Sequence, residues 1–210
     1  MNRWLVGVSA AALAALAAGA ASAATVVTFS SYQTGLNAGE SLVTNFDGSS
    51  VSVPAGVTVG GDATLMTGTS NFGAAPATSA LTQDLTQYLA VQAGQTFTLS
   101  GLNLGEISFY VGSLDSFNSF TFTGAGGFSQ SFTGAQLTAA TAAADQASGN
   151  STAAATNGRY TFTFDQAITG LQLGSTSPSL EVSDIGAIAF ATAGGIPEPA
   201  AWSLMLLGFG

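Results

Sequence analysis

The sequence predicts an all-β protein, an antiparallel β-sandwich of jelly-roll type, and three observations lead to this fold class. Apolar and polar residues alternate along most of the chain, Gly or Asn interrupts the alternation roughly every ten residues, and helical periodicity is rare. Alternation of this kind is typical of half-buried antiparallel strands. Short strands without helices between them favour two sheets packed face to face, and a jelly roll protects their edges. A β-helix is the rival architecture, but it would need a fixed short repeat, which the sequence lacks.

The first 23 residues have the pattern of a secretory signal peptide. One positive charge, Arg3, precedes a short apolar run, and the small residues Ala-Ser-Ala at 21–23 follow it. We expect cleavage after Ala23 or Ala24. A membrane anchor is the alternative, but the run is barely as long as the roughly 20 apolar residues that a span needs.

Residues 24–192 form the predicted sandwich domain, long enough for one self-sufficient core. Its expected strands are TVVTFSSY (25–32), SVSVPAGVTVGG (50–61), ATLMTG (63–68), QTFTLS (95–100), EISFYVGS (106–113), SFTFTG (119–124), RYTFTF (159–164), GLQLGS (170–175) and LEVSDIGAIAF (180–190). Helical signals are confined to two places. Leu81, Leu85 and Leu89 are spaced for helical turns around 79–86, and Ala-rich 134–156 is expected to be mostly loop, with a helical turn near Gln136–Ala143.

Threonine occupies the polar side of three predicted strands, at Thr96, Thr98, Thr121, Thr123, Thr161 and Thr163. Such a face presents methyl and hydroxyl groups side by side, which suits sugar rings or ordered water. Thr is also favoured in any exposed strand, so an ordinary solvent-facing pleat is the alternative. A functional face requires these six residues to share one flat, uncovered sheet surface.

The composition excludes several classes of function. Two basic residues stand against eleven acidic ones, without His or Cys, and loss of the signal peptide leaves Arg159 as the only cation. Nucleic acid is therefore not an expected partner, because phosphate binding needs clustered Lys and Arg. Nucleophilic triads, zinc sites of His or Cys and Lys Schiff bases are excluded as well.

No catalytic residue is expected, and we predict that the protein is not an enzyme. A carbohydrate-active hydrolase or lyase with paired carboxylates is the alternative. Its candidate residues are Glu106, Asp115, Asp165 and Glu181.

No cofactor is required by this sequence, although calcium is possible. Calcium prefers six to eight oxygen ligands, and the candidates are Asp115, Asn118, Asp145 and Asp184. Asp and Asn are also common turn formers, which is the alternative. Arg159 is expected to pair with Asp145 or Asp165.

The C-terminal segment 193–210 consists of a Gly-rich linker, the triplet Pro197-Glu198-Pro199, Trp202 and an apolar tail. The two prolines keep the peptide extended, as a processing enzyme needs, and Trp suits a membrane interface. This segment resembles the PEP-CTERM sorting signal of Gram-negative bacteria, in its PEPxxW subgroup. The resemblance implies processing by an exosortase and transient association with the inner membrane. The tail from residue 200 is about half a membrane span and lacks the family's terminal Arg cluster.

A second resemblance covers the last half of the domain. Segments 109–122, 144–164 and 179–190 are similar to the "GSxDxYN … NRYV … FEIDNI" pattern of exosortase-dependent surface proteins, with Phe117 in place of Tyr and "VSDI" in place of "IDNI". In those proteins the domain is a β-sandwich. Together the two resemblances imply an exported protein of the cell envelope, outer surface or biofilm matrix. The expected partners of its sandwich are exopolysaccharide, other matrix proteins or ice.

Overall fold

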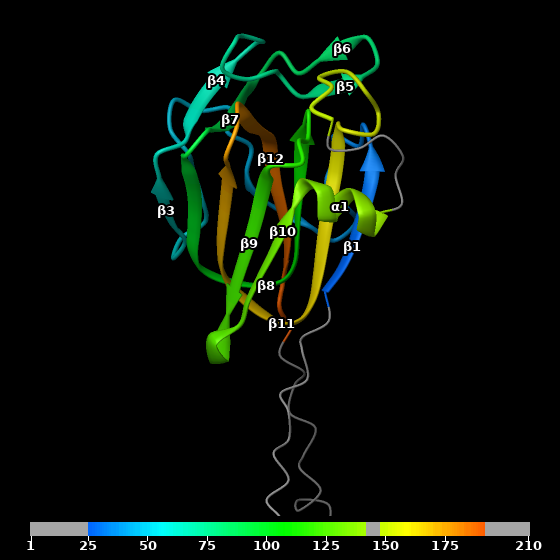
Figure 1. Cartoon of the computed structure of the whole chain (residues 1–210). Coiled ribbons are helices and arrows are strands. Elements are labelled where there is room, and N and C mark those ends of the chain that lie inside the picture. Colours follow the sequence, from blue (N-terminus) through cyan, green and yellow to red (C-terminus); the bar gives the residue numbers. More distant parts are fainter. Residues whose placement is uncertain (1–24, 142–147, 192–210) are drawn as a thin grey trace, which may run out of the picture.

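The computed structural model describes residues 25–141 and 148–191, which form a ten-stranded antiparallel sheet and a separate two-stranded hairpin (Figure 1). The signal peptide, the linker with its sorting motif, and Asp145 lie outside the described residues. The elements are β1 (Thr25–Ser31), β2 (Ser41–Thr44), β3 (Thr58–Gly61), β4 (Thr64–Thr67), β5 (Ala77–Ser79), β6 (Thr82–Gln83), β7 (Gln87–Gln92), β8 (Thr96–Gly112), β9 (Asn118–Gly124), the 3-10 turn η1 (Ala125–Gly127), β10 (Ser129–Thr133), α1 (Gly134–Thr141), β11 (Gly158–Ser175) and β12 (Ser179–Ala189). The predicted all-β class is confirmed.

The long strands β8 and β11 fold the sheet over on itself. Residues 96–100 of β8 pair with 170–174 of β11, and residues 106–111 pair with 158–163. Between these stretches the register of β11 shifts, and β8 passes through Gly101, whose φ is +77°. Only glycine adopts that backbone conformation without strain. Irregularities of this kind let a strand turn a corner and belong to two packed sheets.

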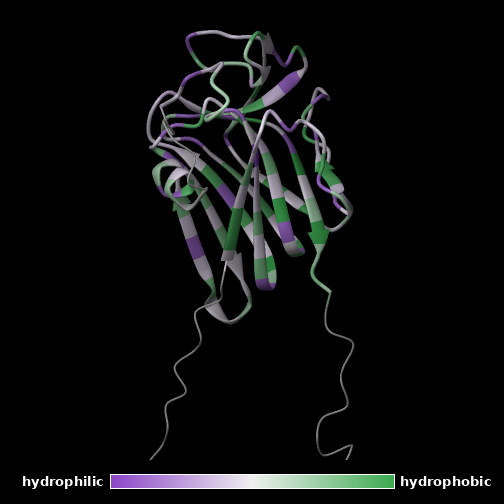
Figure 2. Ribbon diagram, turned by 90° about the vertical axis from the view of Figure 1, so that its right-hand side faces the viewer, coloured by the Kyte–Doolittle hydropathy of each residue, from purple (hydrophilic) through white to green (hydrophobic). Residues whose placement is uncertain are grey.

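The result is the predicted antiparallel sandwich, with two layers that we call layer A and layer B. Layer A consists of β3, the first part of β8, the last part of β11, β9 and β10. Layer B consists of β1, the first part of β11, the last part of β8, β12 and β2. Strand β7 pairs with the first residues of β12, and β4 pairs with β7, so these two strands widen layer B at that end. Figure 2 shows the alternation of hydrophobic and polar residues along these strands.

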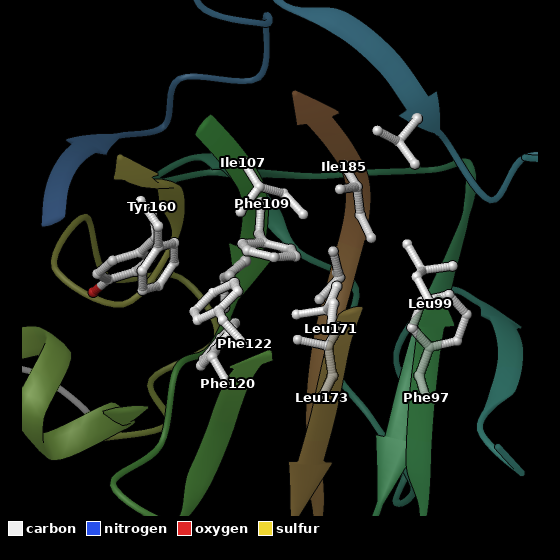
Figure 3. Close-up of a cluster of buried hydrophobic side chains, with 14 of the residues drawn as sticks. Phe97, Leu99, Ile107, Phe109, Phe120, Phe122, Tyr160, Leu171, Leu173 and Ile185 are labelled. Carbon is white, nitrogen blue, oxygen red and sulfur yellow. The ribbon is translucent and has the colours of Figure 1, made fainter. Parts of the chain in front are cut away.

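The hydrophobic core lies between the two layers (Figure 3). Phe120 and Phe122 of layer A meet Phe109 and Phe162 of layer B, with ring centroids 4.7 to 6.3 Å apart. All four rings are fully buried. Aromatic pairs contribute about 0.5–1.5 kcal/mol each beyond the burial of their area, so this cluster fixes one layer against the other.

The two helical predictions have opposite outcomes. Helix α1 confirms the helical turn predicted near residues 136–143, and its Leu137 is buried in the core. The helix predicted over 79–86 is wrong, because the chain there forms the β5–β6 hairpin. Leu81 and Leu85 point to solvent, whereas Leu89 is buried in strand β7 between β4 and β12. Tertiary pairing of β7 therefore decides the local structure over the helical spacing.

Both ends of the described domain lie at the same end of the sandwich (Figure 1). Thr25 pairs with Phe164, and Ala189 pairs with Leu104, near the corner where β8 and β11 bend. The β5–β6 hairpin lies at the opposite end, which we call the distal end. None of the described helices is long and apolar enough to cross a membrane.

Candidate functional site

The outer surface of layer A is an array of small polar residues, which we call the hydroxyl face. Its residues are those that alternate with the buried side chains of the five strands. From one edge to the other they are Ser129, Ser131 and Thr133 of β10; Ser119, Thr121 and Thr123 of β9; Gly170, Gln172 and Gly174 of β11; Thr96, Thr98 and Ser100 of β8; and Thr58 and Gly60 of β3. The opposite sides of the same strands carry core residues.

Glycine at the centre keeps this face low. A Cβ atom added to Gly170 would approach Thr123 Oγ1 to 2.5 Å, and one added to Gly174 would approach Ser119 Oγ to 2.9 Å. The neighbouring hydroxyl groups therefore lie over the bare backbone of β11. Gln172, which is exposed between the two glycines, is the largest side chain of this central strand on the face.

The face is exposed at its edges and partly exposed at its centre. Within it, one side chain–side chain hydrogen bond joins Thr121 Oγ1 and Ser131 Oγ, at 2.7 Å. The Thr133 hydroxyl donates to Gln136 Oε1 at 3.3 Å. The remaining hydroxyl groups of the face make no hydrogen bond with one another and can meet solvent or ligand. Each hydroxyl can donate one hydrogen bond and accept two.

Two of the six predicted threonines are not on this face, which corrects the expectation of a single surface. Thr161 and Thr163 belong to the part of β11 in layer B, where they pair with β1 and β8. Thr161 is buried and accepts a hydrogen bond from Asn37 Nδ2, at 2.9 Å. The bend in β11 separates these residues from Gln172 and its neighbours, because it carries the strand from one layer to the other.

A segment at 32–40, which we call the strap, crosses the outer side of layer B. Arg159 holds it there: its Nε donates to the Gly35 carbonyl and its Nη2 to the Thr34 carbonyl. Nη2 also pairs with Asp184 Oδ1 at 2.7 Å, and Nη1 donates to Ser108 Oγ. The described partner of Arg159 is therefore Asp184 and not the expected Asp165, whereas Asp145 lies outside the described residues. Adjacent strands bring Asp184 beside it, since both residues are opposite Tyr110 of β8.

The four candidate carboxylates do not share one cleft. Glu106 accepts a hydrogen bond from Thr163 on layer B, and Asp165 is exposed at the bend of β11. Glu181 is buried near the distal end, where Ser113 Oγ, Ser179 Oγ and the Ala74 amide donate to it. Burial raises the pKa of Glu181, and the charge of Asp115 raises it further. These donors are intramolecular, so Glu181 acts as an anchor of the loops at 70–76.

The calcium candidates are only partly brought together. The Asp115 amide donates to Asn118 Oδ1 at 2.7 Å, and Asn118 Nδ2 donates to Ser175 and Ser179. Burial raises the pKa of Asp115 to about 6. Asp184 is committed to Arg159, and Asp145 lies outside the described residues. Among residues 25–141 and 148–191, no group of three or more acidic side chains lies close enough together to hold a metal ion. Calcium binding stays a prediction.

A groove at the distal end is the second surface feature. It is lined by Ala80, Leu81, Thr82, Gln83, Leu85 and Thr152. Beside it, the loop that carries exposed Phe72 is tied to the hairpin through Thr69 Oγ1 and Gln83 Oε1, at 3.1 Å. Among the described residues that line the groove, none is a carboxylate. These described residues offer apolar contact from Leu81 and Leu85 and no group for acid–base chemistry.

Sequence reasoning found part of the hydroxyl face and missed the rest. The sequence predicts Thr96, Thr98, Thr121 and Thr123 on this face. It does not predict the serines of β10, because SQSFT at 129–133 is not among the expected strands. The same period-two alternation was present there, with Gln130 and Phe132 directed inward. The glycines at 170 and 174 occupy polar positions of the expected strand 170–175.

Fold and surface together define an all-β sandwich that carries an uncharged, hydroxyl-rich sheet face. Comparison with protein-family models, with curated proteins and with solved structures finds no match to this chain.

Proposed function

We propose that this chain is an exported cell-envelope or extracellular-matrix protein, processed by an exosortase at its PEP motif. Its sandwich is an adhesive module that associates with exopolysaccharide or other matrix proteins. The single observation that carries the proposal is the arrangement of the domain's ends: Thr25 and Ala189 lie at one end of the sandwich, away from the distal loops.

This arrangement suits a protein handled at a membrane through both chain ends. The predicted signal peptide precedes β1 and the predicted sorting motif follows β12, so both connect to the same end of the sandwich. Export and sorting machinery bound to those segments would leave the hydroxyl face and the distal groove free. The uncharged hydroxyl face and the scarcity of basic residues suit solvated matrix material better than nucleic acid or an anionic membrane.

The test is intact-mass measurement on envelope and matrix fractions of a host that has an exosortase. The exported chain is expected to begin at Ala24 or Thr25 and to lack the residues after the PEP motif. Replacing Pro197 and Pro199 with Ala is expected to leave the tail uncut, whereas Pro178→Ala, in the turn between β11 and β12, serves as the control. Retention of Met1, or the same C-terminal mass in the Pro197/Pro199 variant, would overturn the proposal.

A further inference from the structure

The chemistry of the hydroxyl face restricts what can bind there. None of its residues is charged, although the chain carries eleven acidic residues. An anionic ligand would need Arg or Lys, and within the described residues the one such side chain, Arg159, is buried under the strap. A cationic ligand would be held by carboxylates, which the face lacks. The complementary ligand is therefore neutral.

The side chains also distinguish a sugar from a protein partner. Centres of protein–protein interfaces are enriched in aromatic residues, Met and Arg, and the hydroxyl face contains none of these. Its hydroxyl groups and the Gln172 amide both donate and accept hydrogen bonds, as sugar hydroxyl groups do. A ligand rich in neutral hydroxyl groups can exchange hydrogen bonds with them at many points.

The shape of the face favours an extended ligand. Strands lie about 4.8 Å apart and residues on one side of a strand about 7 Å apart, so the side chains form a regular grid. Two rows of the grid cross β11 at a glycine: one contains Thr123, Gly170 and Ser100, and the other contains Ser119 and Gly174. At these glycines the hydroxyl groups of Thr123 and Ser119 lie over the buried backbone of β11, so no bulky side chain interrupts the rows. Many weak contacts along a chain molecule add to a useful affinity.

From these observations we infer that the hydroxyl face binds a neutral polysaccharide chain lying flat across the strands of layer A. The inference rests on the proposed function, which it deepens by naming the surface and the class of ligand. The rows mix Ser, Gly and Gln with Thr, so the methyl groups do not repeat regularly. This irregularity favours a polysaccharide over the periodic surface of ice.

The test uses the purified full chain in co-sedimentation with insoluble neutral glucans, namely cellulose and a β-1,3-glucan, and in affinity electrophoresis with dextran and galactomannan. Alginate serves as the acidic counterpart. We expect binding to at least one neutral polymer and none to alginate. The variant Thr98→Lys/Thr121→Lys is expected to lose at least tenfold in affinity, because long charged side chains then stand up from the face.

Matched controls separate the face from general effects of charge and folding. Thr28→Lys/Thr163→Lys adds the same charge to exposed positions of layer B and is expected to bind like wild type. If the lysine variant does not fold, the near-isosteric Thr98→Val/Thr121→Val removes the hydroxyl groups and keeps the strand propensity, and it is expected to weaken binding several-fold.

Two results would overturn the inference: wild type binds none of the neutral polymers, whether or not it inhibits ice recrystallisation, or the face variants bind as wild type does. The proposed function is judged separately, by the location and mass of the chain. A correctly exported and processed chain with an inert face leaves that proposal intact. A chain that binds glucan but is neither exported nor processed would refute the proposed function and leave the binding face in place.

Discussion

At the scale of single residues, the described chain contains few ionisable groups, and three of its carboxyl groups lie where burial works against their charge. Desolvation raises the pKa of Asp115, Glu181 and Asp184. For Asp184 the neighbouring Arg159 guanidinium opposes this rise. These residues anchor loops and the strap, and none of them lies on the hydroxyl face.

Asp115 makes stability depend on pH in a direction that can be measured. Its pKa rises from 3.8 to about 6 on folding, so the folded state binds more protons between those values. Stability conferred by this group is present below the lower value and is lost as the pH rises through the higher one. Because Asn does not titrate, Asp115→Asn is expected to remove this group's contribution to the pH dependence of stability. Urea unfolding between about pH 4 and pH 7 is expected to show a flatter profile for the variant, and parallel profiles would contradict the prediction.

Arg159 is expected to be among the most sensitive positions of the chain. Arg159→Met leaves the buried Asp184 carboxylate and the Thr34 and Gly35 carbonyl groups without their donor, which is expected to cost about 3–5 kcal/mol of unfolding free energy. Arg159→Met/Asp184→Asn removes both charges and is expected to be less damaging than the single change. Urea titrations measure both, and a cost below about 1 kcal/mol for Arg159→Met would refute the role of this pair.

At the scale of elements, the β5–β6 hairpin and β7 divide a sequence segment that looks helical. Leu81 is 97% exposed and Leu85 is 84% exposed, whereas Leu89 is 1% exposed. A helix would have placed all three on one buried stripe. The hairpin and the segment that follows it instead present Leu81 and Leu85 at the distal groove, and β7 places Leu89 in the core.

This division predicts unequal effects of similar substitutions. Leu81→Ser and Leu85→Ser are expected to change the unfolding free energy by no more than about 0.5 kcal/mol, because neither side chain is buried. Leu89→Ala is expected to cost about 2–5 kcal/mol through the cavity it leaves. Equilibrium unfolding in urea measures all three, and equal losses at the three positions would restore the helical interpretation.

At the scale of the whole molecule, the two bent strands make the layers interdependent. Both β8 and β11 contribute to layer A and to layer B, so neither layer is complete without the other. Two strands, β11 and β8, lie between the two ends of the described domain, because Thr25 is on β1 and Ala189 is on β12. Three strand spacings of about 4.8 Å place them roughly 14 Å apart.

Circular permutation tests this architecture. A linker of about six residues spans the gap between Thr25 and Ala191, since each residue extends up to about 3.3–3.6 Å. New termini opened in the exposed turn at Gly126 are expected to preserve the far-ultraviolet circular dichroism and cooperative unfolding. Opening β8 between Leu102 and Asn103 is the matched control, and it is expected to prevent folding. Equal behaviour of the two permutants would contradict the shared-strand arrangement.

The sequence by itself determined the all-β class, most strands and the side of each strand that faces the core, because alternation with a period of two is a local property. It therefore placed Thr96, Thr98, Thr121 and Thr123 correctly on the polar side of their strands. Its expectations for export and sorting at the chain ends concern residues outside the described structure and stay predictions.

Only the tertiary structure decided which polar sides join into one surface. Two predicted segments merged into β11, and the bend between them sent Thr161 and Thr163 to layer B, away from Gln172. Likewise, Asp184 became the partner of Arg159 through strand order rather than sequence proximity. Pairings between residues far apart in the chain follow from packing the whole core, and local patterns do not encode them.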